Sequence, residues 1–298
     1  MILNASGCLD ALAAPGVARE LDAFVTKTVT PLPREGNAPV RIAETETGML
    51  NSIGLANPGI DRFRANVLPR LAELGIPVWV SVGGFCADDY ADICAQLDSE
   101  LVVDTIELNV SCPNVAAADE AAHEIVTAAR TATGKPLYAK LSPSLPDVAA
   151  VAVAAAEAGA GGLSLVNTLR GLSLDGHTLR PTLATATGGL SGPALRSVAL
   201  AAVYACYGAT ALPIVGMGGV ESGRHALELV AAGASAVALG TVLFADPGAP
   251  ARIRAELEAE ATRRGFSSPL AARGCAHDAV ARPENKHREM RPLSNLKV

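Results

Sequence analysis

The sequence predicts a (β/α)8 barrel, and three observations support this fold class. Short apolar runs rich in β-branched residues alternate with longer Ala- and Leu-rich amphipathic segments along the 298-residue chain. Eight such runs can be counted, which matches the strand number of this barrel. Unusual polar residues and glycines follow the runs directly, as expected where the carboxyl ends of barrel strands carry a binding site.

The eight predicted strands are the short apolar runs bounded by turn residues. They are Ile2–Ala5, Ala23–Thr28, Val78–Val82, Thr105–Val110, Pro136–Leu141, Gly162–Val166, Pro213–Gly216 and Ala234–Leu239.

Three helices between these strands are clearly marked. Residues Pro146–Ala158 carry apolar side chains at positions i, i+3, i+4 and i+7, which place them on one helical face. Glu221–Ala232 and Ile60–Leu74 are each followed by a glycine, Gly233 and Gly75, as is typical of helix C-termini. The alternation also fits a doubly wound open sheet, which strand counting does not exclude. No G-x-G-x-x-G follows the first strand, so a dinucleotide-binding half is not supported.

Length and composition set the domain organisation. Half of the residues are hydrophobic, and a single barrel can reach 298 residues. The sequence therefore predicts one barrel domain over residues 1–276 and a polar C-terminal tail over residues 277–298. Two connectors, Lys27–Gly59 and Asn167–Gly192, are too long for plain loops, and long loops of this kind are often functional.

Charge, cysteine spacing and hydropathy exclude several classes of partner. The net charge of −6 argues against a nucleic-acid partner. The six cysteines form no C-x-x-C pair, so neither a zinc site nor an iron–sulfur cluster is indicated within this chain. There is no signal peptide, and no run approaches the ~18 apolar residues that span a membrane. We expect a cytoplasmic protein that does not associate with a membrane.

Polar residues gather after the predicted strands and define a candidate site. If the barrel is correct, all of them face the same end. They are Ser6, Lys27, Asn51, Asn57, Asn109, Cys112, Asn114, Lys140, Ser142, Asn167 and Thr168.

Glycine turns follow the last two strands. Gly216-Met217-Gly218-Gly219 and Leu239-Gly240-Thr241 occupy the positions where barrels often bind phosphate, although each could be an ordinary tight turn. With Lys27 and Lys140 at the same end, they indicate a phosphorylated cofactor across the barrel top. A lysine beside a flavin ring would stabilise negative charge on the reduced flavin.

The segment Asn109–Asn114, with sequence NVSCPN, is the most informative motif. It places two amides and the Cys112 thiol directly after a buried strand. A lone cysteine is usually a small buried hydrophobic residue, and Pro and Asn favour turns. The polar residues after the other strands make a catalytic loop the better interpretation.

These motifs, over Ile2 to Ala276, resemble dihydroorotate dehydrogenase of the soluble class 1 type, closest to the class 1B catalytic subunit. The resemblance rests on Lys27–Asn37, Asn51–Gly59, Asn109–Asn114, Lys140–Pro143, Asn167–Gly171, Gly188–Pro193 and the two glycine turns. Family members usually open with a hairpin that closes the barrel bottom, whereas Met1 here stands directly before the first predicted strand.

The resemblance implies a role for each matching residue. Cys112 would be the base that removes the C5 proton of dihydroorotate, and it also assigns the class, because class 2 enzymes carry serine at this position. The substrate would be bound by Lys27, Asn51, Ile53, Gly54, Leu55, Asn109, Asn114, Asn167 and Thr168. FMN would be bound by Ala5, Ser6, Lys27, Thr28, Asn109, Lys140, Val166, Gly192, Gly218, Gly219, Gly240 and Thr241. No metal is implied.

The implied reaction is oxidation of dihydroorotate to orotate in pyrimidine (UMP) biosynthesis, with the hydride passing to FMN. The implied assemblies are a homodimer, or a heterotetramer with an electron-transfer subunit carrying FAD and a [2Fe–2S] cluster. The alternatives are a dihydropyrimidine dehydrogenase-like flavin enzyme acting on another dihydropyrimidine, and a non-catalytic barrel that serves as a binding protein.

Overall fold

The structure is a computed structural model, and it describes residues 1–110 and 118–278. Eight parallel strands form one sheet in the order β1-β12-β11-β8-β7-β6-β5-β2. These strands are β1 (Ile2–Asn4), β2 (Phe24–Val25), β5 (Val78–Val82), β6 (Val103–Asn109), β7 (Leu137–Leu141), β8 (Gly162–Leu165), β11 (Ile214–Met217) and β12 (Ala236–Leu239). Each coincides with one of the eight predicted strands; β5 has the predicted bounds, and the ends of the others are shifted by a few residues.

The two end strands of this sheet meet, so the sheet closes into a barrel. Leu3 of β1 forms a parallel bridge with Ala23 beside β2. The Asn4 side chain completes this seam, because its Nδ2 donates to the Val25 carbonyl at 2.7 Å and its Oδ1 accepts from the Val25 amide at 2.8 Å. Closure rejects the doubly wound open sheet and confirms the predicted (β/α)8 class.

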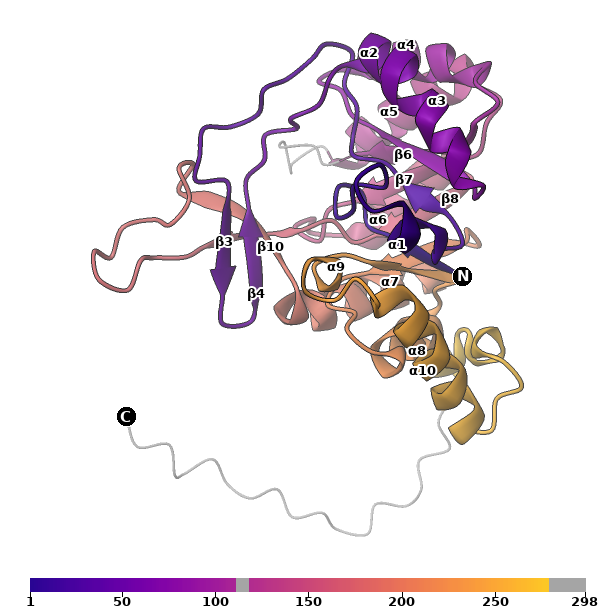
Figure 1. Cartoon of the computed structure of the whole chain (residues 1–298). Coiled ribbons are helices and arrows are strands. Elements are labelled where there is room, and N and C mark those ends of the chain that lie inside the picture. Colours follow the sequence, from indigo (N-terminus) through magenta and orange to yellow (C-terminus); the bar gives the residue numbers. More distant parts are fainter. Residues whose placement is uncertain (111–117, 279–298) are drawn as a thin grey trace.

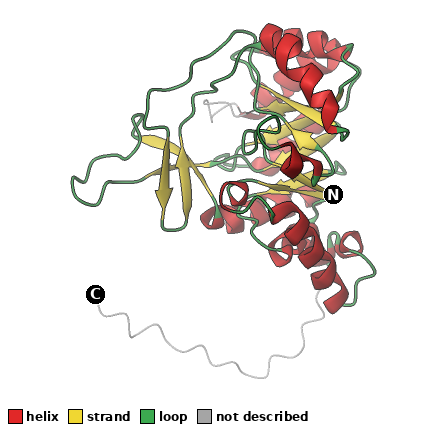
Figure 2. Cartoon of the chain, viewed as in Figure 1, coloured by secondary structure: helices red, strands yellow, loops and turns green. Residues whose placement is uncertain are grey.

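Helices surround the barrel (Figures 1 and 2). The α-helices are α1 (Pro15–Arg19), α2 (Ile60–Arg62), α3 (Leu68–Leu71), α4 (Ala87–Asp98), α5 (Ala118–Ala132), α6 (Val148–Glu157), α7 (Arg196–Ala209), α8 (Gly223–Ala232), α9 (Val242–Ala245) and α10 (Ala249–Arg263). None of the helices within residues 1–110 and 118–278 is both long enough and apolar enough to cross a bilayer.

The three helices marked in the sequence are present. The α6 helix begins after Asp147, whose carboxylate accepts from the amides of Ala149 and Ala150 as an N-cap. The predicted helix Ile60–Leu74 is helical throughout but irregular, because a π-helix over Phe63–Val67 separates α2 from α3. Pro69 explains the irregularity, since it cannot donate the backbone hydrogen bond that a regular helix requires.

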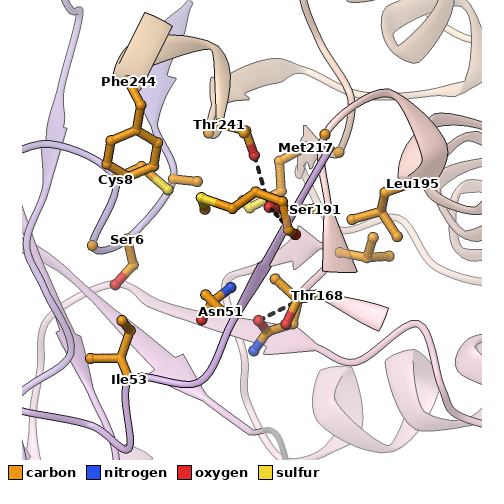
Figure 3. Close-up of a pocket in the computed structure, with 18 of the residues that line it drawn as sticks. Ser6, Cys8, Asn51, Ile53, Thr168, Ser191, Leu195, Met217, Thr241 and Phe244 are labelled. Carbon is orange, nitrogen blue, oxygen red and sulfur yellow. Dashed lines mark hydrogen bonds between the residues drawn. The ribbon is translucent and has the colours of Figure 1, made fainter. Parts of the chain in front are cut away.

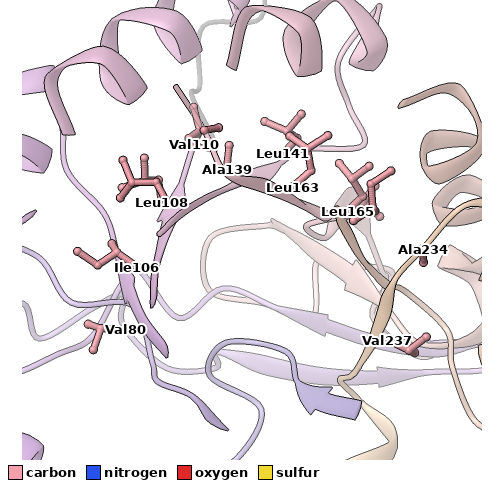
Figure 4. Packing of buried hydrophobic residues seen from close by; sticks show 14 of the residues in the cluster. Val80, Ile106, Leu108, Val110, Ala139, Leu141, Leu163, Leu165, Ala234 and Val237 are labelled. Carbon is pink, nitrogen blue, oxygen red and sulfur yellow. The ribbon is translucent and has the colours of Figure 1, made fainter. Parts of the chain in front are cut away.

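Two hydrophobic layers hold the barrel together. Outward-facing strand residues such as Ile106, Leu108, Leu141 and Leu163 are fully buried against the helices (Figure 4). Inside the barrel, a second cluster centred on Leu3, Val25, Trp79, Val215 and Met217 fills the lower interior. The barrel interior is therefore a packed core, with a cavity at the carboxyl ends of its strands.

A second, antiparallel sheet lies beside the barrel and was not predicted. Its strands are β3 (Ile42–Thr45), β4 (Gly48–Asn51), β9 (Leu169–Leu172) and β10 (Thr187–Ser191), in the order β3-β4-β10-β9. The two long connectors supply these strands in pairs, and Figure 1 shows β3, β4 and β10 projecting from the barrel. We call this four-stranded sheet the roof sheet.

The chain packs against the barrel as far as the end of the described residues. His277, which the sequence assigned to the tail, stacks on Tyr204 of α7 with ring centroids 3.8 Å apart. Its Nε2 also lies 3.0 Å from the Ala232 carbonyl at the end of α8. The division into a barrel domain and a tail stays a prediction, but His277 packs with the barrel.

Candidate active site

A cavity of about 440 Å³ opens at the carboxyl ends of the barrel strands, beneath the roof sheet (Figure 3). This volume lies in the range of sites that hold cofactors and small ligands. It is lined by every described residue to which the sequence assigned a binding role. These are Ala5, Ser6, Lys27, Thr28, Asn51, Ile53, Gly54, Leu55, Asn109, Lys140, Val166, Asn167, Thr168, Gly192, Gly218, Gly219, Gly240 and Thr241.

Two other residues singled out by sequence, Asn57 and Ser142, are described by the structure and do not line the cavity. Cys112 and Asn114 lie outside the described residues. Asn57 holds the loop shape instead, because its Oδ1 accepts from the amides of Thr30 and Gly59. Ser142 accepts a hydrogen bond from the Ser144 amide in the turn after β7.

The roof sheet brings distant segments to the cavity. The Asn51 Nδ2 on β4 donates to the Gly189 carbonyl on β10 at 3.2 Å. The Thr241 hydroxyl after β12 donates to the Ser191 hydroxyl on β10 at 2.8 Å. The cavity wall therefore depends on contacts between strands that lie far apart in the sequence.

The loop after β4 adopts an unusual backbone conformation. Gly54 has a φ of +74°, and Leu55, which is not a glycine, has a φ of +56°. A left-handed leucine is uncommon and costs about 1 kcal/mol or more. The Asn57 Nδ2 stabilises the loop by donating to the Leu55 carbonyl at 2.7 Å.

Two lysines supply positive charge to the cavity. Lys140 on β7 is buried, and its Nζ lies 3.6 Å from Oε1 of Glu107 on β6. Lys27 follows β2. Burial, reinforced by the Lys140 charge, lowers the pKa of the Lys27 ammonium from its ordinary value. The site can therefore neutralise an anionic ligand.

Two amides meet at the wall formed by β6 and β8. The Asn167 Nδ2 donates to the Asn109 Oδ1 at 3.0 Å. The Tyr90 hydroxyl of α4 donates to the Asn109 carbonyl at 2.9 Å, which fixes the end of β6. An amide both donates and accepts, so this wall suits a ring with alternating N–H and C=O groups.

The predicted phosphate turns are present, and the glycines differ in why they are needed. A Cβ on Gly218 would come within 2.8 Å of the Ala199 Cβ, and Gly219 has a φ of +66°, so both are required by the turn itself. A Cβ on Gly240 would meet nothing closer than the Ala5 Cβ at 3.7 Å. Neither the Gly218 nor the Gly219 amide donates a hydrogen bond within the described residues. The turns can therefore hold a phosphate group.

Sequence reasoning missed several lining residues. Cys8 lies beside Phe244 at one end of the cavity (Figure 3), and burial raises the pKa of its thiol despite the opposing charges of Lys140 and Lys27. Its position after the first strand could have revealed it, as it revealed Ser6. Met49 and Ser191 had no such signal, because the roof sheet was read as loop.

Comparison with known proteins places this site in a family. The family model described as dihydroorotate dehydrogenase matches residues 1–260. The chain belongs to the dihydroorotate dehydrogenase family. It is 45% identical over 264 residues to the "Dihydroorotate dehydrogenase B (NAD(+)), catalytic subunit" of Desulforudis audaxviator, with 86% of each chain covered. It is 42% identical over 256 residues to the protein of the same name from Listeria monocytogenes, with 84% of each covered.

A solved structure supports the fold. The dihydroorotate dehydrogenase of Eimeria tenella, crystallised with ferulenol, superposes with a TM-score of 0.78, covering 93% of this chain and 85% of its own, at 24% identity. As a member of the dihydroorotate dehydrogenase family, this chain is a flavin-dependent oxidoreductase.

Proposed function

We propose that this chain oxidises dihydroorotate to orotate in pyrimidine (UMP) biosynthesis, with FMN as its flavin. One observation carries the proposal. In a chain of this family, a single cavity gathers two lysines, three asparagine amides and two glycine turns at the carboxyl end of the barrel. This set matches the needs of a phosphorylated flavin lying beside a small polar ring.

The position of each residue in the cavity determines which part of the cofactor it would contact. Gly192, Gly218, Gly219, Gly240 and Thr241 would hold the ribityl phosphate, because backbone amides and open space meet there. Lys27 and Lys140 would hold the ring, with Ala5 and Ser6 beneath it. When bound, FMN supplies an acceptor for the hydride that leaves C6 of the substrate.

Asparagine side chains would orient the substrate. Asn51, Asn109 and Asn167 line the same cavity, and Asn114 is assigned to this group by sequence alone. The alternating donors and acceptors of a pyrimidine ring pair with such amides. This pairing favours orotate over a substrate without polar ring substituents.

Cys112 is the proposed base for the C5 proton of dihydroorotate. This proton lies next to a carbonyl group, so a positioned base can remove it. A free thiol has a pKa of ~8.5 and is mostly protonated at neutral pH. The rate of flavin reduction should therefore rise toward alkaline pH, and a flat profile would contradict the role.

We also propose that electrons leave through a partner subunit to NAD. The support is the name shared by the relatives, which describes an NAD(+) enzyme and its catalytic subunit. A heterotetramer with a subunit carrying FAD and a [2Fe–2S] cluster would provide this route. The described residues contain no cluster of metal-binding side chains of their own.

The test is an anaerobic visible spectrum of the purified chain with bound FMN, before and after adding L-dihydroorotate. Bleaching of the oxidised-flavin band at about 450 nm is the expected result. A bound flavin that dihydroorotate does not bleach would refute the substrate, and a chain that cannot bind FMN would refute the cofactor. Reoxidation by fumarate without a partner would refute the NAD route.

A cysteine variant tests the base. Cys112→Ala should bind FMN normally but reduce it about 10²–10⁴-fold more slowly with dihydroorotate. Cys86→Ala is the matched control, since Cys86 is exposed and does not line the cavity. Equal slowing in both variants would remove Cys112 from the mechanism.

A further inference from the structure

The barrel interior carries a polar layer between its hydrophobic lower part and the cavity. Alternate residues of a strand share a face. Trp79 and Tyr138 therefore point inward with Ser81 and Lys140 above them, and the two aromatic rings lie 4.6 Å apart. Strand register places Ser81 beside Glu107 and Lys140 beside Ser164. The polar layer consists of Ser81, Glu107, Lys140 and Ser164.

Glu107 is the exceptional member of this layer. It is 1% exposed, and its Oε1 accepts no hydrogen bond from any of the described residues. A buried carboxylate without hydrogen bonds is costly, and it is tolerated only where a charged partner compensates it. The Lys140 Nζ at 3.6 Å is that partner, and among the described residues no other carboxylate lies within ion-pair distance of Lys140.

Lys140 in turn faces the cavity. It is 6% exposed, and it lines the cavity wall together with Lys27 and Cys8. Lys27 forms no ion pair within the described residues and repels Lys140, whereas the nearby Cys8 and Tyr138 are neutral in their ordinary protonation states. Within the part of the chain that the structure describes, Glu107 is thus the one carboxylate that faces the Lys140 ammonium at ion-pair distance.

We propose that Glu107 is a positioning residue that fixes the Lys140 ammonium, charged, against the flavin site and thereby sets how readily the bound flavin accepts electrons. The effect on the flavin rests on the proposed function, whereas the effect of Glu107 on the Lys140 ammonium does not. A fixed cation beside the ring stabilises the negative charge of the reduced flavin. Because Glu107 lies behind Lys140 in the barrel interior, it acts through the lysine.

The first experiment needs no flavin. In the apo chain, ¹³Cε-labelled lysines are titrated by NMR, and the Lys140 signal is assigned by its loss in Lys140→Met. In Glu107→Gln, the response of the Lys140 signal to pH should differ from that of wild type, because the glutamine amide keeps the shape but not the charge of the carboxylate. Ser164→Ala is the matched control, since it perturbs the same layer without removing charge, and there the Lys140 titration should be unchanged.

The second experiment measures the midpoint potential of bound FMN against pH. In the pH range in which Lys140 of Glu107→Gln has lost its proton, reduction of the flavin should be accompanied by uptake of one extra proton at Lys140. The midpoint potential should then fall more steeply with pH in Glu107→Gln than in wild type. The extra slope corresponds to a tenfold change in the reduction equilibrium constant per pH unit, which is about 30 mV per pH unit for a two-electron couple. In the Lys140→Met background, Glu107→Gln should leave the pH slope of the potential unchanged, because the effect passes through the lysine.

The outcomes separate this inference from the proposed function. An identical Lys140 titration in wild type and Glu107→Gln overturns the inference, whatever the flavin does. An equal effect of Glu107→Gln with and without Lys140 overturns the route through the lysine. A wild-type flavin that dihydroorotate does not reduce refutes the proposed substrate but leaves the Lys140 titration as evidence. If Glu107→Gln does not fold, the flavin potentials of Lys140→Met and of the double variant Glu107→Leu/Lys140→Met are compared instead, since removing both partners of a buried ion pair preserves folding. Equal potentials in these two variants support the inference, and a difference overturns it.

Discussion

Replacing Asn4 by alanine should open the seam at which the barrel closes. Asn4 is fully buried, and its amide makes both hydrogen bonds to the backbone of Val25, at 2.7 and 2.8 Å. Each lost bond costs about 1 kcal/mol, and the Val25 amide and carbonyl left without a partner add a desolvation cost of about 1–3 kcal/mol between them. The total loss of unfolding free energy should be about 3–5 kcal/mol.

Urea unfolding of the flavin-free chain measures this loss, and the m-value should stay constant if only stability changes. Asn66→Ala is the matched control, because Asn66 is exposed and should change stability by no more than about 0.5 kcal/mol. A loss of less than about 1 kcal/mol for Asn4→Ala, or one equal to that of the control, would refute the role of Asn4 in closing the barrel. Since Ala5 and Ser6 follow directly and line the cavity, flavin affinity should fall along with stability.

Two further predictions concern the cavity. Because folding lowers the pKa of the Lys27 ammonium, the unfolded chain binds more protons than the folded chain between that lowered pKa and the ordinary lysine value of 10.5. The stability contributed by this group therefore rises with pH across this window. Lys27→Met should therefore stabilise the flavin-free chain at neutral pH, by an amount that shrinks toward pH ~10, and should weaken FMN binding. Denaturation at several pH values measures the stabilisation, and a stabilisation that grows with pH would contradict the prediction. Gly240→Ala should leave stability within about 0.5 kcal/mol but weaken FMN binding, because its Cβ would meet protein atoms only at van der Waals distance while lying in the cavity lining. Gly219→Ala should cost about 1–2 kcal/mol in a left-handed turn. Thermal melts and flavin titrations compare the two variants, and a reversed order of stability would contradict these roles of the glycines.

Much of the barrel could be predicted from sequence because its strands are buried on both faces. Such strands appear as continuous apolar runs, and Val78–Val82 was predicted to the residue. The roof sheet could not be predicted in this way. Its strand β3 alternates half-exposed and exposed residues, and β10 contains two glycines, so neither produces an apolar run.

The candidate site was predictable wherever a polar residue directly follows a strand. Lys27, Asn109 and Lys140 all line the cavity for this reason. Glu107 escaped notice because it stands within the strand, where an isolated charged residue looks like part of an apolar run. Only the position of Lys140 on the neighbouring strand shows that this carboxylate has an ion-pair partner. The pairing of two strands cannot be predicted from the local sequence of either one.

Within residues 1–110 and 118–278, the roof sheet and the barrel share no strand ladder. The roof sheet pairs β4 with β10, whose residues Asn51 and Gly189 are 138 positions apart, while the barrel keeps its own hydrogen bonds throughout. The upper wall of the cavity can therefore separate from the lower wall without breaking any pairing that holds the barrel closed. A mutation in the roof sheet can therefore alter ligand exchange while leaving the strand pairing of the barrel unchanged.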